Sequence, residues 1–282
     1  MDDWSGNSRP GVRDGLVDGH VHLFPPGVQK AIYRWFRERD WRLAVDGLMG
    51  EEILAYLARK GVSRAVGCAY AHKPGLATFL NDWLADLARD HPMVLPLGTV
   101  HPDDPDPAAE ARRCLDELGF AGLKVHCAVQ EVAADDARLF PVYEAALDRG
   151  RPVLIHAGGA PYPTPWLGYE RFAALMRRYP DLKVQVAHLG MWEHPRFLRL
   201  ADRYPNLYFD LAAVTDRHMG LPTETLEAIL RRYPERIIFG SDAPVIEGDY
   251  ETFPRFLERL SLPEMALRHV FRSNALDLWD VP

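Results

Sequence analysis

Cysteine is scarce in this chain, and long apolar runs are lacking. Only 3 of the 282 residues are cysteines. Cys68, Cys114 and Cys127 form no Cys-x-x-Cys pair, which favours a reduced, cytoplasmic protein over a disulfide-stabilised one. No apolar stretch approaches the roughly 20 residues of a membrane-spanning helix. Residues 1–14 are polar and lack the apolar core of a signal peptide, so we expect a flexible N-terminal segment and no membrane partner.

Clusters of one charge are also lacking. The 33 basic and 40 acidic side chains are well mixed and give a net charge of −7, a balance that argues against a nucleic-acid surface. Hydrophobic residues make up 48% of the chain, which is enough for one large buried core and predicts a single domain over residues 15–282. We therefore expect a small-molecule substrate rather than nucleic acid or a membrane.

A glycine-rich phosphate loop is absent at the position where a dinucleotide-binding fold would carry one. The first apolar run ends at His22 and continues as Leu23-Phe24-Pro25-Pro26. Short apolar runs then alternate with longer amphipathic stretches, as strands alternating with helices require. The eight expected strands are residues 16–22, 64–69, 94–101, 121–126, 152–156, 183–188, 207–211 and 236–242. This alternation predicts one closed (β/α)8 barrel of the TIM type, an α/β fold.

One connection in this pattern is unusually long. Residues 23–48 separate the first expected strand from the first clear helix, which begins near residue 51. The aromatic residues of this segment are Phe24, Tyr33, Trp35, Phe36 and Trp41. Long loops at the carboxyl end of a barrel usually build or cover the active site. We predict a lid or pocket wall here, with a surface helix packed on the barrel rim as the alternative.

Histidine and aspartate side chains stand where several of the expected strands end. These residues are His20, His22, His156, His188 and Asp242. The carboxyl ends of barrel strands lie together, so the five side chains should converge. Taken singly, each histidine could be an ordinary hydrogen-bonded strand end, and Asp242 could be a helix N-cap. Together they are the ligand types of a catalytic divalent-metal site, for which we expect zinc, with manganese possible.

Four further polar residues lie near the same strand ends. Lys124 and His126 are two apart on the fourth expected strand and should face the same side. Burying an ammonium group is costly, so a buried Lys124 needs a functional partner. His126 is expected to contact the substrate, to support a ligand or to act as an extra one. His101 and Arg217 could also contact the substrate, with a hydrogen-bonded histidine and an exposed loop arginine as the alternatives.

Six short motifs follow one another along the chain. They are Val-Asp-Gly-His-Val-His (17–22), Gly-Leu-Lys-Val-His (122–126), Val-Leu-Ile-His-Ala-Gly (153–158), Val-Ala-His-Leu-Gly (186–190), Phe-Gly-Ser-Asp-Ala-Pro (239–244) and Asn-Ala-Leu (274–276). In order and spacing this set resembles the amidohydrolase superfamily. The resemblance is to its amidohydrolase-related group, which includes metal-dependent hydrolases and the aminocarboxymuconate-semialdehyde and resorcylate decarboxylases. It extends from Leu16 to about Leu278 and implies a metal-dependent barrel enzyme.

The resemblance also implies roles for single residues. The ligand set that it implies is His20, His22, His156 and Asp242. His188 corresponds either to a ligand of a second metal or to a free group that polarises the reacting bond. Lys124 corresponds either to a carbamate that bridges two metals or to a charged contact of an acidic substrate. A structural role for Lys124, with its head in solvent, is the third possibility.

Hydrolysis is the first expectation for the reaction. A divalent ion lowers the pKa of bound water from 15.7 to about 7, which prepares that water to attack an amide, lactone or ester bond. Asp242 would accept the proton and His188 would stabilise the developing oxyanion. Non-oxidative decarboxylation of an aromatic or unsaturated carboxylic acid is the alternative. A non-catalytic binding barrel is disfavoured by the complete ligand set. The number of ions, one or two, and a homodimer stay open.

Overall fold

Eight parallel strands form the centre of the computed structural model, which describes residues 9–43, 45–159, 164–214, 220–245 and 248–279. The strands are β1 Leu16–His22, β2 Val62–Cys68, β3 Val94–Thr99, β4 Gly122–His126, β5 Val153–His156, β6 Val184–Val186, β7 Leu207–Asp210 and β8 Ile237–Ile238. They pair in chain order from β1 to β8. Hydrogen bonds from Gly19 N to Phe239 O and from Asp242 N to His20 O then join β1 to the segment that follows β8. The predicted (β/α)8 barrel is therefore confirmed.

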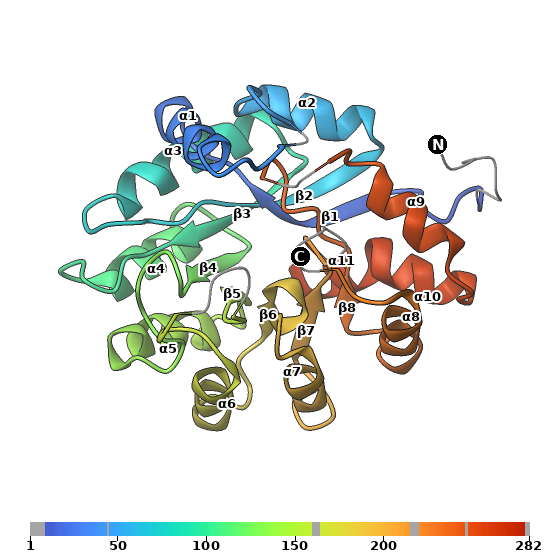
Figure 1. Cartoon of the computed structure of the whole chain (residues 1–282). Coiled ribbons are helices and arrows are strands. Elements are labelled where there is room, and N and C mark those ends of the chain that lie inside the picture. The colour runs from blue at the N-terminus through green and yellow to red at the C-terminus, as the bar shows by residue number, and fades with distance from the viewer. Residues whose placement is uncertain (1–8, 44, 160–163, 215–219, 246–247, 280–282) are drawn as a thin grey trace.

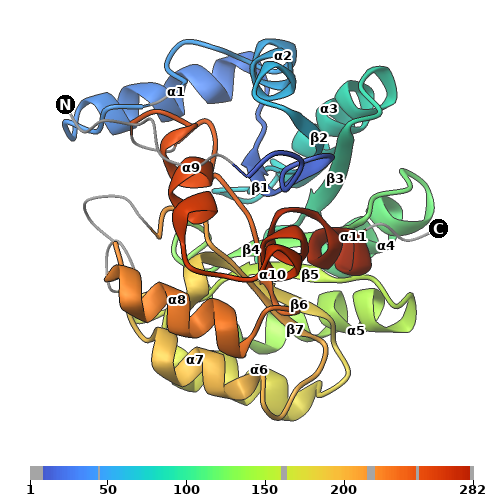
Figure 2. The ribbon, with the colours of Figure 1, turned by 90° about the vertical axis from the view of Figure 1, so that its right-hand side faces the viewer.

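Helices surround these strands on the outside (Figure 1; Figure 2). They are α1 Pro26–Arg37, α2 Glu51–Arg59, α3 Ala77–Asp90, α4 Pro107–Asp116, α5 Phe140–Asp148, α6 Tyr169–Arg178, α7 His194–Leu200, α8 Thr223–Arg232, α9 Thr252–Arg259 and α10 Glu264–Arg268. A further helix, α11 Asn274–Trp279, lies at one end of the barrel. Buried residues recur at helical spacing, such as Leu80, Leu84 and Leu87 of α3, because one face of each helix packs inward. No helix within the described ranges combines the length and apolar character needed to cross a membrane.

Helix α1 occupies the long connection between β1 and α2. Its N-cap is Pro25 and its first residue is Pro26, a position where proline is tolerated because the first helical N–H has no intrahelical partner. Tyr33 is buried and donates a hydrogen bond to Val45 O at 3.2 Å, which ties the helix to the segment that follows it. Residues 23–48 thus contain a helix, as the alternative interpretation predicted.

Strands β6 and β8 are shorter than the sequence pattern indicated. Beyond Val186, residues 187–190 form a short 3-10 turn in which His188 and Leu189 have φ values of 55° and 56°. After β8, Phe239 N donates to Val270 O at 2.8 Å. Val270 belongs to a π-helical turn, His269–Ser273, which separates α10 from α11. The chain therefore leaves the sheet where the expected site residues begin.

The interior of the barrel is closed at the amino-terminal ends of the strands by α11. Leu278 and Trp279 belong to a buried cluster with residues early in β1 and β5, including Val17 and Leu154. A Cβ atom on Gly122 would lie 2.7 Å from the Trp279 ring, so this close approach requires glycine.

The chain is anchored to the barrel before β1 begins. Arg9 donates hydrogen bonds to the carbonyls of Leu260 and Leu262, and Arg13 forms an ion pair with Glu258 at 2.7 Å. Val12 is buried. The expected flexibility of residues 1–14 is therefore not found from Arg9 onward, where the segment makes specific contacts. Residues 1–8 lie outside the described ranges.

Candidate metal centre

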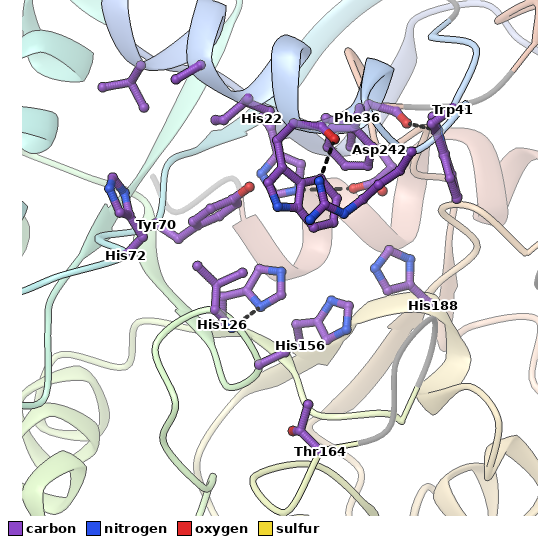
Figure 3. Close-up of a pocket in the computed structure, with 18 residues that line it drawn as sticks. His22, Phe36, Trp41, Tyr70, His72, His126, His156, Thr164, His188 and Asp242 are labelled. Carbon is purple, nitrogen blue, oxygen red and sulfur yellow. Dashed lines mark hydrogen bonds and ion pairs between the residues drawn. The ribbon is translucent and has the colours of Figure 1, made fainter.

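The expected ligands gather at the carboxyl ends of the strands. In Figure 3, His22, His156, His188 and Asp242 point toward a common space from separate elements. One ligand atom each from His20, His188 and Asp242 lie within 4.8 Å of one another. The ring centroids of His20 and His22 are 4.9 Å apart, and those of His156 and His188 are 4.8 Å apart. The convergence predicted from the strand ends is thus present in the structure.

Asp242 provides the test of whether a metal ion fits this cluster. Its Oδ1 atom lies 3.0 Å from Nε2 of His22 and 3.6 Å from Nε2 of His20. This buried oxygen nevertheless has no aligned hydrogen-bond donor. An oxygen and two nitrogens that face one another without hydrogen bonds are the arrangement that a shared cation would satisfy. The residues therefore fit a divalent ion.

Outward contacts of the histidines support the same conclusion. Nδ1 of His188 lies 2.7 Å from Ala212 O, Nδ1 of His22 lies 3.5 Å from Cys68 Sγ, and Nδ1 of His20 lies 3.1 Å from Asp210 Oδ2. In each of the three histidines, Nδ1 contacts a neighbouring protein atom, and Nε2 points toward the cluster. Such outer partners fix the ring orientation of metal-binding histidines.

The charges of the cluster shift its pKa values in both directions. Burial alone would raise the pKa of Asp242, but the imidazoles of His22, His188 and His20 outweigh it and hold that pKa below its usual range. Burial and the neighbouring Lys124 ammonium lower the pKa of His20. Burial also opposes charge on His22, yet its contacts with Cys68 and Asp242 raise its pKa to about 9. The lowered pKa keeps the Asp242 carboxylate ionised, which is the form that binds a cation.

Two backbone positions in the cluster adopt a conformation that side chains other than glycine rarely take. His188 has a φ of 55° and Asp242 a φ of 65°. Such positions cost of order 1–3 kcal/mol each and concentrate at functional sites, where the surrounding structure holds them. For Asp242, the hydrogen bond from its N to His20 O, 2.9 Å long, provides part of that support. The carboxylate is therefore directed at the histidines rather than acting as a helix N-cap.

Lys124 is fully buried in β4. Its Nζ lies 3.2 Å from Nε2 of His20, and Lys124 is not among the described residues that line the pocket. The proposed role with the ammonium head in solvent is therefore wrong. The structure places Lys124 beside the ligand nitrogen of His20; its assignment as a carbamate bridge or a substrate contact stays a prediction.

The three remaining candidates fall into different places. His126 lines the pocket and stacks on His156 with ring centroids 4.2 Å apart; burial and His156 lower its pKa well below the usual value. His101 is not among the described lining residues and accepts a hydrogen bond from Asp103 N at 3.2 Å, so our expectation of a substrate contact is corrected to the ordinary hydrogen-bonded histidine. Arg217 lies outside the described residues.

A cavity of about 560 Å³ opens above the cluster. We call its polar base the floor, which comprises His22, His126, His156, His188 and Asp242. His20 and Asp210 are fully buried, do not line the cavity, and contact these residues. We call its opposite side the wall, which comprises the lining residues of α1 and the turn after it, Val28, Ala31, Ile32, Trp35, Phe36, Arg39 and Trp41. The segment 23–48 is thus both a helix and a pocket wall, as its aromatic content suggested.

Sequence reasoning missed several lining residues. Tyr70 contacts both His22 and His126 edge to face, with centroids 5.3 and 4.9 Å apart. It follows β2 in Cys68-Ala69-Tyr70, so the same strand-end criterion that selected the histidines could have found it. Thr164 and Val245 also line the cavity, and no local pattern marks them.

Comparison with known proteins agrees with this geometry. The amidohydrolase family profile matches residues 17–281. The chain belongs to the amidohydrolase family. It is accordingly an enzyme of the amidohydrolase superfamily, in the amidohydrolase-related group that includes metal-dependent members.

Two curated relatives are named as decarboxylases. The chain is 30% identical over 135 residues to 2-amino-3-carboxymuconate-6-semialdehyde decarboxylase of Dictyostelium discoideum, which covers 41% of this chain and 38% of that protein. It is 26% identical over 245 residues to gamma-resorcylate decarboxylase of a Polaromonas species, covering 71% of this chain and 74% of that protein. The match thus spans about two fifths of the first relative and about three quarters of the second.

A solved structure shares the fold over its whole length. It is 5-carboxyvanillate decarboxylase of Novosphingobium aromaticivorans, complexed with manganese and 4-hydroxy-3-methoxy-5-nitrobenzoic acid. The TM-score is 0.71 at 16% identity, with both chains covered completely. The printed names of both curated relatives describe decarboxylases, the alternative of our sequence analysis, and not hydrolases.

Proposed function

We propose that this protein is a metal-dependent, non-oxidative decarboxylase of an aromatic carboxylic acid. The observation that carries the proposal is the pairing of the His/Asp floor with an aromatic wall across one cavity. Trp35, Phe36 and Trp41 form part of that wall, and their rings contact one another with centroids 5.0 and 5.7 Å apart. Flat aromatic faces favour a ring-shaped substrate.

One divalent ion, zinc or manganese, would be held by His20, His22, His156 and Asp242. Their nitrogen and oxygen ligands suit both metals, and the related 5-carboxyvanillate decarboxylase was solved with manganese. When bound, the ion supplies positive charge that fixes the substrate's carboxylate or adjacent hydroxyl and stabilises charge built up during the reaction.

The protein's own groups would complete the chemistry. Decarboxylation breaks the bond between a ring carbon and the carboxylate carbon, carbon dioxide leaves, and that ring carbon takes a proton. His188 donates its Nδ1 hydrogen to Ala212 O, so its Nε2 faces the cavity. An imidazolium that also carries a hydrogen on Nε2 would deliver that proton to the ring carbon and return to the neutral form. The wall meanwhile holds the ring and excludes water. Arg39 is the one permanently charged cation among the described lining residues, and we assign it to an acidic group at the pocket mouth.

Hydrolysis remains the second candidate because of Lys124. A fully buried lysine beside His20 Nε2 is where a carbamate bridging two metals would lie. The metal content of purified protein separates the two functions. Decarboxylation as proposed predicts near one ion per chain that persists in Lys124→Ala, whereas the bridged hydrolase predicts near two ions, falling in that variant.

A direct test is a paired substrate panel. Protein stripped with a chelator and reloaded with Mn²⁺ or Zn²⁺ is offered hydroxybenzoates labelled in the carboxyl carbon, together with matched lactones, esters and anilides. We expect metal-dependent release of labelled carbon dioxide from at least one acid. Metal-dependent hydrolysis without carbon dioxide release would overturn the proposal in favour of the second candidate.

A further inference from the structure

A chain of buried hydrogen bonds runs from the last helix to the floor. Trp279 of α11 donates its indole N–H to Oε1 of Gln185 at 2.7 Å. Because indole nitrogen can only donate, this bond identifies the oxygen of the Gln185 amide. The amide nitrogen then donates to Asp210 Oδ2 at 2.7 Å and to Gly19 O at 2.9 Å. These hydrogen bonds fix the orientation of the Gln185 amide whether or not a metal ion is bound.

Asp210 is the point where this chain meets the histidines. Its Oδ1 accepts from the backbone N–H groups of His188 and Ala212 at 2.9 and 3.1 Å. Its Oδ2 accepts from Gln185 and lies 3.1 Å from Nδ1 of His20. A carboxylate surrounded by three certain donors has no hydrogen to give, so His20 must donate from Nδ1. The lone pair of a neutral His20 is therefore on Nε2, the atom that faces Asp242.

We propose that Asp210 is a positioning residue whose contacts, held by Gln185 and Trp279, fix the tautomer of His20 and the backbone of His188 for metal binding. The inference rests on the metal centre of the proposed function, but not on the reaction catalysed there. In this proposal, Trp279 of α11, at the opposite end of the barrel, helps to orient the histidines of the floor through Gln185 and Asp210. All four side chains in the chain are fully or almost fully buried, so water cannot substitute for a missing partner.

Asp18 provides a matched control within the same barrel. It is also a fully buried carboxylate. It accepts from His20 N at 3.3 Å, from Ser241 N at 2.9 Å and from the Tyr250 hydroxyl at 3.1 Å, but none of its hydrogen bonds involves an imidazole ring. If Asp210 had only a structural role, Asp18→Asn and Asp210→Asn should have similar effects on metal affinity and on the His20 tautomer.

The decisive experiment compares these two variants in the metal-free state. In Asp210→Asn, the oxygen can stay on the two backbone donors. The new NH₂ group then faces Nδ1 of His20 and can no longer accept from the Gln185 amide. An NH₂ donor there favours the opposite tautomer and places a hydrogen on Nε2. The tautomer is read from ¹⁵N-histidine NMR spectra, with the His20 signal assigned by its loss in His20→Ala.

Metal affinity, measured by competition with a chromophoric chelator for Zn²⁺ and Mn²⁺, is the second reading and needs no substrate. We expect Asp210→Asn to switch the His20 tautomer and to weaken binding about 10- to 100-fold, the usual cost of losing such an outer partner, while Asp18→Asn changes the Kd less than threefold. Equal losses in both variants, or an unchanged tautomer in Asp210→Asn, would overturn the inference.

Trp279→Phe provides a second route should Asp210→Asn not fold. It removes the donor that orients Gln185 and leaves the Asp210 carboxylate in place. We expect metal binding to weaken several-fold and His20 to populate both tautomers. A wild-type Kd together with a wild-type tautomer would count against a role for Gln185 and Trp279. Loss of decarboxylase activity in the substrate panel, with these results intact, would instead reject only the proposed reaction.

Discussion

The floor and the wall of the cavity are built in opposite ways. Floor residues stand at the ends of barrel strands, are buried or half-buried, and are held by specific hydrogen bonds such as those to Asp210 and Ala212. The wall belongs to one helix outside the barrel and the turn after it, and its Trp35 side chain is 43% exposed. Under the proposed function, the rigid sheet would fix the chemistry and the added segment would select the substrate.

The largest expected effect comes from breaking the floor at a ligand. His20→Ala should lower activity about 1,000-fold or more, because the ion's stabilisation of transition-state charge, several kcal/mol, is lost. Metal content by mass spectrometry should fall toward zero while circular dichroism stays unchanged. The surface variant His91→Ala is the control. If the His20→Ala variant kept both its metal and its activity, His20 could not be a metal ligand.

His188 sharpens the comparison within the floor. His188→Asn should lower kcat by about 100- to 10,000-fold, the usual contribution of a proton-transfer group, without lowering metal content. Asparagine is chosen because it tolerates the positive φ at this position. Loss of about half the bound metal would instead make His188 the ligand of a second ion.

Changes in the wall should leave the metal untouched and alter binding. Phe36 is half-buried, so Phe36→Ala should raise KM about tenfold through lost apolar contact with the ring, with kcat nearly unchanged. Phe79→Ala removes an exposed phenylalanine away from the cavity and serves as the control. A fall in metal content in Phe36→Ala would show that floor and wall are not independent.

Arg39 carries the smallest expected effect. It is exposed, so Arg39→Gln should raise KM for acidic substrates about two- to fivefold, as expected of an exposed ion pair. The difference should shrink in high salt because exposed charges are screened. Arg34→Gln, on the preceding helix α1 but not among the described lining residues, is the control. An equal effect of both substitutions would remove Arg39 from the substrate site.

Sequence patterns predicted the floor better than the wall for a physical reason. Strand-end residues such as His20 and His156 are placed by the barrel itself, so finding the strands also finds the side chains that converge. In residues 23–48, Val28, Ala31, Ile32, Trp35 and Phe36 do recur at the spacing of one helix face. This spacing does not say where the helix lies relative to the barrel, and Pro25-Pro26 conceals the start of α1 until its N-terminal position is seen. The segment's aromatic content indicated a pocket wall, but not which faces would line it.

Contacts across the barrel were beyond sequence reasoning. Gln185 lies in the middle of β6 and Asp210 ends β7, and only the folded chain brings them to Trp279 and His20. Lys124 was correctly placed on β4, but its burial beside His20 Nε2 depends on how barrel closure brings β4 near β1, which no local pattern gives. His101 failed for a different reason, because its ring accepts a short-range hydrogen bond from Asp103 N instead of lining the pocket.

The most direct test of the account is a crystal structure of the metal-loaded protein with a substituted benzoate that cannot lose its carboxylate. The account predicts one ion bound by His20, His22, His156 and Asp242, with the benzoate's polar groups toward the floor and its ring against Phe36 and Trp41. An ion held by other residues, or a ring that makes no contact with α1, would contradict it.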